Sequence, residues 1–268
     1  MYSNVEWDFE RLVTAVEKVS DYSRRRTEQR ELAALRMDLE SDTAHVIESV
    51  RAYTMSTAQN LSATIRLAVE AIEAGRIGDF AEFGTWMGGA SFAMLLAQRR
   101  LYGKIVRPVW MFDSFQGLPI PDERDGPMAV KYRRETDAPS YRENCTAPLD
   151  KVMAAIHDFD FAADEAIVVP GWFNESVPRH EAELARRGIA VLRVDCDFYE
   201  PVSYVLRQLT PLMPDEGVII LDDYYAWDGC ARATHDFLSQ NNLSWRIRSM
   251  DRLHGAWMIK RGHRINAL

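Results

Sequence analysis

From residue 79 onward, the chain consists of short apolar runs that alternate with stretches of helical periodicity. The apolar runs predict strands at 79–83, 108–113, 166–170, 190–195 and 217–222. Runs that are apolar along most of their length are typical of a parallel sheet with helices on both faces, because both sides of each strand are then buried. The stretches between them predict helices near 88–101, 146–157, 176–187, 200–210 and 228–241. The pattern therefore predicts a doubly wound α/β fold.

Two further apolar runs, at 244–250 and 255–261, predict a final pair of strands. Only a few residues separate them, and so short a link favours an antiparallel hairpin at the sheet edge, because a parallel crossover needs a dozen or more residues. Seven strands in a mostly parallel sheet resemble the Rossmann-like, class I fold of S-adenosylmethionine-dependent methyltransferases. We therefore expect residues 76–268 to form one methyltransferase-like domain.

The first 75 residues show helical periodicity instead. Apolar residues recur at helical spacing in 5–19 and 61–75, and the stretch 30–55 is also helix-like. We expect an N-terminal helical extension over residues 1–75, and an amphipathic extension of this length favours a homo-oligomer. Residues 117–144 form a long insertion rich in Pro, Asp, Glu and Arg, which is typical of either a lid over a site or a disordered surface loop.

Composition excludes several classes of partner. The 268 residues carry a formal net charge of −8, which argues against nucleic-acid binding because phosphate backbones require a surplus of Lys and Arg. No stretch approaches the roughly 18 apolar residues of a membrane span, and the N-terminus lacks the pattern of a signal peptide. The three cysteines form no CxxC motif, which fits a reducing compartment. We therefore expect a soluble, cytoplasmic protein that acts on a small molecule.

A glycine-rich turn follows the first predicted strand. The stretch DFAEFGTWMGGAS places Gly84, Gly88 and Gly89 between this strand and a helix. Glycines let the backbone turn at positive φ and approach a ligand closely, and open α/β sheets bind cofactors at this end of their strands; the alternative is that the glycines serve packing alone. The second strand ends at Asp113, whose carboxylate can bind both hydroxyls of a ribose or cap a helix or turn.

Four carboxylates follow the fourth and fifth predicted strands. Asp195 and Asp197 end the fourth strand, and Asp222 and Asp223 end the fifth. We expect these strands to be neighbours about 4.8 Å apart, so that their carboxyl ends meet and the acids converge. Converging carboxylates repel one another unless a positive charge lies among them, and an oxygen-only set favours a hard cation such as Mg²⁺. The alternative is that these aspartates only cap strand ends.

Two other segments contain candidate contacts to a cofactor. The sequence GWF, at 171–173, follows the third strand, and its Trp172 either stacks on a cofactor or covers the sheet. The sequence TMST, at 54–57, includes Met55 and lies at the end of the helical extension. From there it can fold over a cofactor bound at the glycine-rich turn.

These motifs resemble those of the macrocin O-methyltransferase family, bacterial enzymes that methylate sugar hydroxyls on natural products such as macrolides and aminocoumarins. The family's order and spacing are matched by GDFAEFGTWMGGAS, MFDSFQGLP, PGWF, VLRVDCDFYEPV and VIILDDY. The resemblance covers about residues 50–260, and the first 45 residues have no counterpart in these motifs. The middle residue of the DxD element is Cys196, where the family usually has Gly.

The resemblance implies S-adenosylmethionine as methyl donor, with Glu82 facing its methionine end and Asp113 its ribose. It also implies Mg²⁺ bound by Asp195, Asp222 and Asp223, with Asp197 as general base. The other residues that we expect at the cofactor are Met55, Gly84, Thr85, Gly88, Ser91, Ser114 and Trp172. The implied function is metal-dependent methylation of a sugar hydroxyl on a glycosylated natural product, in antibiotic-type biosynthesis.

Three other functions stay open from the sequence. A catechol-type O-methyltransferase uses a similar metal and cofactor on aromatic diols, and one sequence does not separate the two acceptor types. A nicotinamide oxidoreductase also has an acid after its second strand, but the glycine turn lacks the GxGxxG spacing and the paired aspartates have no role in it. A cofactor-binding module without activity gains nothing from the repulsion among the aspartates.

Overall fold

The computed structural model describes residues 42–136, 142–250 and 255–262. Predictions that fall on residues 1–41, including the first helix of the N-terminal extension, lie outside the described residues. The residues from His45 onward form one compact unit. The expected homo-oligomer stays a prediction.

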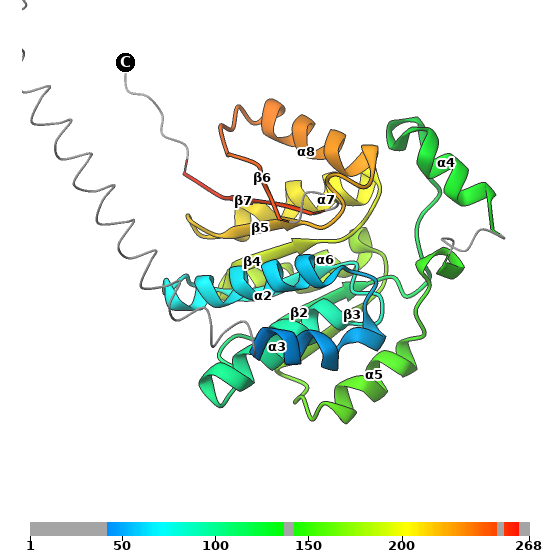
Figure 1. Ribbon diagram of the computed structural model, residues 1–268. Helices are drawn as coiled ribbons and strands as arrows, with labels where there is room; N and C mark the ends of the chain where they lie inside the picture. Colours follow the sequence, from blue (N-terminus) through cyan, green and yellow to red (C-terminus); the bar gives the residue numbers. More distant parts are fainter. Residues whose placement is uncertain (1–41, 137–141, 251–254, 263–268) are drawn as a thin grey trace, which may run out of the picture. The chain divides into compact units, whose positions relative to one another are not determined.

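A seven-stranded sheet forms the centre of this unit (Figure 1). Its strands lie in the order β3-β2-β1-β4-β5-β7-β6. The strands are β1 (Asp79–Phe83), β2 (Val109–Asp113), β3 (Ala166–Pro170), β4 (Ile189–Val194), β5 (Val218–Leu221), β6 (Arg248–Ser249) and β7 (Ala256–Ile259). The first five pair in parallel, and β7 pairs antiparallel with both β5 and β6. The predicted mostly parallel sheet with an antiparallel edge hairpin is confirmed.

Helices cover both faces of the sheet, because successive strand residues point to opposite sides and both sides are apolar. The helices are α2 (Ala58–Glu73), α3 (Gly89–Tyr102), α4 (Gly126–Arg134), α5 (Leu149–Asp158), α6 (Phe173–Arg187), α7 (Tyr199–Leu209) and α8 (Asp228–Gln240). Phe80 of β1 packs in a core with α2, α3 and α5, whereas its neighbour Ala81 packs in a second core with α6, α7 and α8. In the described ranges, no helix is long and apolar enough to cross a membrane.

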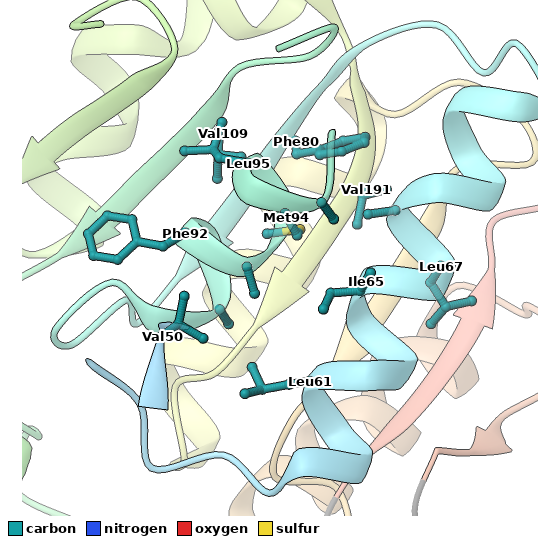
Figure 2. Packing of buried hydrophobic residues seen from close by; sticks show 14 of the residues in the cluster. Val50, Leu61, Ile65, Leu67, Phe80, Phe92, Met94, Leu95, Val109 and Val191 are labelled. Atoms are coloured by element: carbon teal, nitrogen blue, oxygen red, sulfur yellow. The ribbon is translucent and has the colours of Figure 1, made fainter. Parts of the chain in front are cut away.

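Figure 2 shows the first of these cores at close range. Leu61 and Ile65 of α2 and Phe92 of α3 pack with Phe80 and Val191 of the sheet, and all five side chains are buried. Helix α2 therefore belongs to the same core as the strands that follow it. The division of the chain between residues 75 and 76 stays a prediction.

The edge hairpin is shorter than the apolar runs suggested. The run 244–250 forms a strand only at Arg248–Ser249, and both of these residues are exposed. The run 255–261 pairs over Ala256–Ile259. Since one side of β6 has no neighbouring strand, few interactions extend its pairing along the run.

The insertion at 117–144 contains ordered helices where the sequence suggested a lid or a loop. It includes the 3₁₀ turn η2 (Glu123–Asp125), helix α4 and part of the 3₁₀ turn η3 (Arg142–Cys145). The buried carboxylate of Asp125 accepts hydrogen bonds from the backbone amides of Tyr199, at 2.5 Å, and Asp122, at 2.8 Å. Asp125 therefore fastens the insertion to the first turn of α7, where a carboxylate is favoured by the helix dipole.

Gly84, which follows β1 directly, has a φ of +89°. A Cβ atom added to it would lie 1.7 Å from the backbone oxygen of Asp195. The chains leaving β1 and β4 therefore pass so closely that only glycine fits. This close approach brings the carboxyl end of β1, with Glu82, next to the carboxyl end of β4, with Asp195.

We predict that Gly84→Ala lowers the free energy of unfolding by about 3 kcal/mol, because both the positive φ and the backbone clash are unfavourable. Gly103→Ala is the matched control, since Gly103 has a φ of +69° but open space around it. The control should cost only about 1 kcal/mol. Urea denaturation of both variants measures these values, and equal losses would contradict the close approach.

Candidate functional site

One cavity of about 770 Å³ lies at the carboxyl ends of the parallel strands. Its lining comes from the segment before α2, the turn after β1, the insertion, and the ends of β2 to β5. The predicted site residues that line it are Met55, Glu82, Gly84, Thr85, Asp113, Ser114, Trp172, Asp195, Asp197, Asp222 and Asp223. One space therefore joins the glycine-rich turn to the paired aspartates, as the topology of a doubly wound sheet favours.

Two predicted cofactor residues, Gly88 and Ser91, are not among the lining residues. Gly88 directly precedes α3 and has a φ of +90°, and a Cβ atom there would lie 2.5 Å from the ring of Phe92. Ser91 is fully buried, and its hydroxyl donates a hydrogen bond to Glu82. The expected contacts of Gly88 and Ser91 with a cofactor stay predictions.

Asp113 organises the turn at one end of the cavity. One carboxylate oxygen accepts the amide of Trp86 at 2.8 Å, and the other accepts the amide of Phe115 at 2.7 Å. Both residues have positive φ, of 48° and 55°, which is uncommon for bulky side chains. Asp113 therefore caps this turn, as one of the two interpretations of its sequence position predicted. A carboxylate has about four acceptor sites, so Asp113 can also accept a ligand hydroxyl.

Two polar atoms beside Asp113 are orphaned. The hydroxyl of Thr85 and the indole N–H of Trp86 are buried and have no hydrogen-bond partner in the described part of the chain, and both residues line the cavity. Unpaired buried polar groups are rare and costly. These two atoms fit a polar ligand at the turn. The sequence analysis missed Trp86, which lies inside the quoted glycine-rich stretch.

The predicted metal ligands also line the cavity and converge there. Asp195, Asp222 and Asp223 each offer a carboxylate oxygen, and these oxygens lie within 4.8 Å of one another. Asp197 stands beside them, since its backbone amide donates a 3.1 Å hydrogen bond to Asp223. Its φ of 58° belongs to the left-handed region, so the backbone adopts a strained conformation to place this side chain.

A buried guanidinium lies among these acids, and the sequence analysis missed it. Nη1 of Arg193 donates to Glu82 and to Asp195, both at 2.5 Å. Nη2 donates to Asp222 and, at 3.0 Å, to the hydroxyl of Ser56. The sequence contains a sign of this contact, because Arg193 is a charged residue in the middle of the apolar run AVLRVD, where a buried strand needs a partner for it.

The arginine offsets only part of the negative charge. Burial raises the pKa of Glu82 to about 7 and that of Asp222 to about 7, although Arg193 acts in the opposite direction on both. Burial and the nearby charge of Asp197 raise the pKa of Asp223 well above its usual range. A further positive charge would relieve this repulsion. Since the donors are all oxygens, the set fits a hard divalent cation.

Residues outside the predicted set complete the cavity wall. Asn60 of α2 donates a 2.8 Å hydrogen bond to Asp222. Tyr132 of the insertion packs edge-on against Trp227, with ring centroids 5.5 Å apart, and both rings line the cavity. Their positions follow from how α2 and α4 pack, which no local sequence pattern specifies.

Comparisons with known proteins agree with this geometry. Residues 8–259 match the family model described as Macrocin-O-methyltransferase (TylF). The match begins at residue 8, so it also spans most of the first 45 residues, for which the quoted motifs gave no counterpart.

Two relatives and one solved structure illustrate the similarity. From Streptomyces olivaceus, the 8-demethyl-8-(2,3-dimethoxy-alpha-L-rhamnosyl)-tetracenomycin-C 4'-O-methyltransferase is 33% identical over 201 residues, 75% of this chain and 73% of the relative. From Micromonospora griseorubida, the mycinamicin III 3''-O-methyltransferase is 31% identical over 209 residues, 77% of this chain and 78% of the relative. The structure of the O-methyltransferase NovP has a TM-score of 0.66 and 27% identity, and covers 78% of this chain and 83% of that chain.

Asp113 gives a pH-dependent prediction, because burial raises its pKa to about 6. In the unfolded chain this carboxyl ionises near pH 4. Its folded-state pKa is higher, so its contribution to stability is full below about pH 4 and is lost as the pH rises to about 6.

We predict that Asp113→Asn removes this loss. The free energy of unfolding of the wild type, relative to the variant, should fall by about 2 to 3 kcal/mol between pH 4 and pH 7. The Asn side chain also loses one acceptor for a backbone amide, but that cost does not depend on pH. Urea titrations at a series of pH values measure the difference, and a difference constant with pH would contradict the prediction.

Proposed function

The chain belongs to the macrocin-O-methyltransferase family, and on that premise we propose that it methylates a sugar hydroxyl of a glycosylated natural product. The observation that carries the proposal is the cavity that joins a cofactor-type turn to the paired aspartates. One relative, from Streptomyces olivaceus, is named for methylation of a rhamnosyl-bearing tetracenomycin at its 4' oxygen. That name supports a glycosylated acceptor for this chain.

The end of the cavity near Asp113 would hold S-adenosylmethionine, which supplies an electrophilic methyl group when bound. Asp113 would accept the ribose hydroxyls through its remaining lone pairs. The orphaned polar atoms of Thr85 and Trp86 would find partners on the same ligand. Glu82, which lines the cavity deeper in, would face the ligand's charged methionine end.

The end of the cavity near the paired aspartates would hold Mg²⁺ through Asp195, Asp222 and Asp223. A bound divalent ion lowers the pKa of hydroxyl groups next to it. The contribution of the protein is to keep these three carboxylates converged and in a largely dry space, where electrostatic attraction to an acceptor is strong.

Asp197 is the proposed general base. Burial, together with the charges of Asp195 and Asp222, raises the pKa of Asp197 well above its usual range. Once ionised, its carboxylate is therefore a stronger base than an exposed aspartate, which suits proton removal from a hydroxyl. The acceptor hydroxyl would give its proton to Asp197, and its oxygen would take the methyl group from the sulfur of the bound donor, which would leave as S-adenosylhomocysteine.

We predict methyl transfer from labelled S-adenosylmethionine to glycosylated macrolides, aminocoumarins or tetracenomycins, and no transfer to their sugar-free aglycones. The assay measures label in the product by mass spectrometry, with simple catechols as a second acceptor class. Transfer to catechols alone would replace the sugar acceptor by an aromatic diol. Absence of transfer to every acceptor, by protein that binds the donor, would contradict the proposed acceptor class.

The variant Asp197→Asn is the internal control for this assay. It keeps the shape of the side chain but removes the basic oxygen, so kcat should fall by about 10² to 10⁴-fold. Binding of S-adenosylmethionine should stay within about twofold of the wild type, because Asp197 is not among the residues proposed to contact the donor. A variant with near-normal kcat would exclude Asp197 as the base.

A further inference from the structure

Arg193 joins residues of the proposed donor site to residues of the proposed metal site through one side chain. Its guanidinium contacts Glu82 of β1, Asp195 after β4, Asp222 after β5, and Ser56 before α2. These partners come from four segments that are far apart in the sequence. Glu82 belongs to the proposed donor site, whereas Asp195 and Asp222 belong to the proposed metal site.

Burial makes these contacts strong and obligatory. The side chain of Arg193 is fully buried, that of Glu82 is 1% exposed, and those of Asp195 and Asp222 are 26% and 11% exposed. Within the described ranges, Arg193 is the cation that pairs with these three acids. If it were removed, the carboxylates would repel one another in a medium that screens charge poorly.

The contacts also select particular oxygens. Arg193 engages Oδ2 of Asp195 and Oδ1 of Asp222, and Oδ1 of Asp222 also accepts the hydrogen bond from Asn60. These contacts leave the other oxygen of each carboxylate available to a cation. Groups that hold the outer oxygens of metal ligands fix the orientation of those ligands and tune their affinity.

We propose that Arg193 is a positioning residue that holds Glu82 and the two aspartates Asp195 and Asp222 in register across the cavity. The inference deepens the proposed function and rests on it, since it assigns a task toward the same donor and metal sites. The task requires the planar fork of arginine. Lysine carries its charge on a single nitrogen, whereas Arg193 contacts these acids through two nitrogens held in one plane.

Arg193→Lys therefore separates geometry from charge. We expect this variant to bind Mn²⁺, a spectroscopic probe for Mg²⁺, about 10 to 100-fold more weakly than the wild type, as found for residues that orient metal ligands. Binding of S-adenosylhomocysteine should also weaken, because Glu82 loses its partner. Electron paramagnetic resonance measures free Mn²⁺, and calorimetry measures binding of S-adenosylhomocysteine.

Arg187→Lys is the matched control. Arg187 forms a 3.1 Å ion pair with Asp79 at the opposite end of β1, and neither residue lines the cavity. This variant should bind both ligands like the wild type. A residue with a merely structural role would lower the melting temperature of Arg193→Lys and leave both dissociation constants of the folded protein unchanged. Unchanged constants in Arg193→Lys would overturn the inference.

A measurement on the wild type applies if Arg193→Lys does not fold. In protein labelled with ¹⁵N-arginine, the guanidinium signals of the buried Arg193 should shift on addition of Mg²⁺ and, separately, of S-adenosylhomocysteine. Signals that do not move with either ligand bound would overturn the inference while leaving the proposed function intact. Wild-type protein that binds neither ligand would overturn the proposed function, and the inference with it.

Discussion

The arrangement of the cavity depends on one electrostatic constraint, the presence of several buried carboxylates around a single guanidinium. Glu82, Asp195 and Asp222 all pair with Arg193, and their elements can meet only because this charge lies between them. Breaking such a buried pair leaves an uncompensated charge and is strongly destabilising. The remaining negative charge of Asp197 and Asp223 makes the same region a site for a cation. Stability and proposed chemistry thus share one cluster of residues.

The topology explains why this cluster and the cofactor-type turn open into one space. The strand order places β1 and β4 side by side at the centre of the sheet, with β2 and β5 flanking them. The carboxyl ends of these four strands therefore line one side of the same cavity. Gly84 allows the chains leaving β1 and β4 to approach closely. Functional side chains at strand ends are held rigidly by the sheet, which favours the fixed distances that methyl transfer requires.

Periodicity and spacing predicted the sheet, because strands buried on both faces read as continuous apolar runs and a short link leaves only an antiparallel hairpin. The convergence of Asp195, Asp222 and Asp223 also followed, since neighbouring parallel strands end at one edge. The contacts of Asn60 and Trp227 did not follow, because they depend on which helix packs against which strand end. The contact between Arg193 and Glu82 depends on the register of β1 and β4, which places these two residues side by side. The helices of the insertion were missed because the hydrogen bond that fastens Asp125 of the insertion to Tyr199 of α7 joins residues far apart in the sequence.

Calorimetric titration of the purified protein with S-adenosylmethionine, in excess Mg²⁺ and again in chelator, tests the central claim most directly. The proposed donor site and the proposed cation site consist of different residues of one cavity. We therefore predict stoichiometric binding of the donor in both conditions. Absence of binding in both would contradict the methyl-donor site and leave the aspartates around Arg193 without the proposed role.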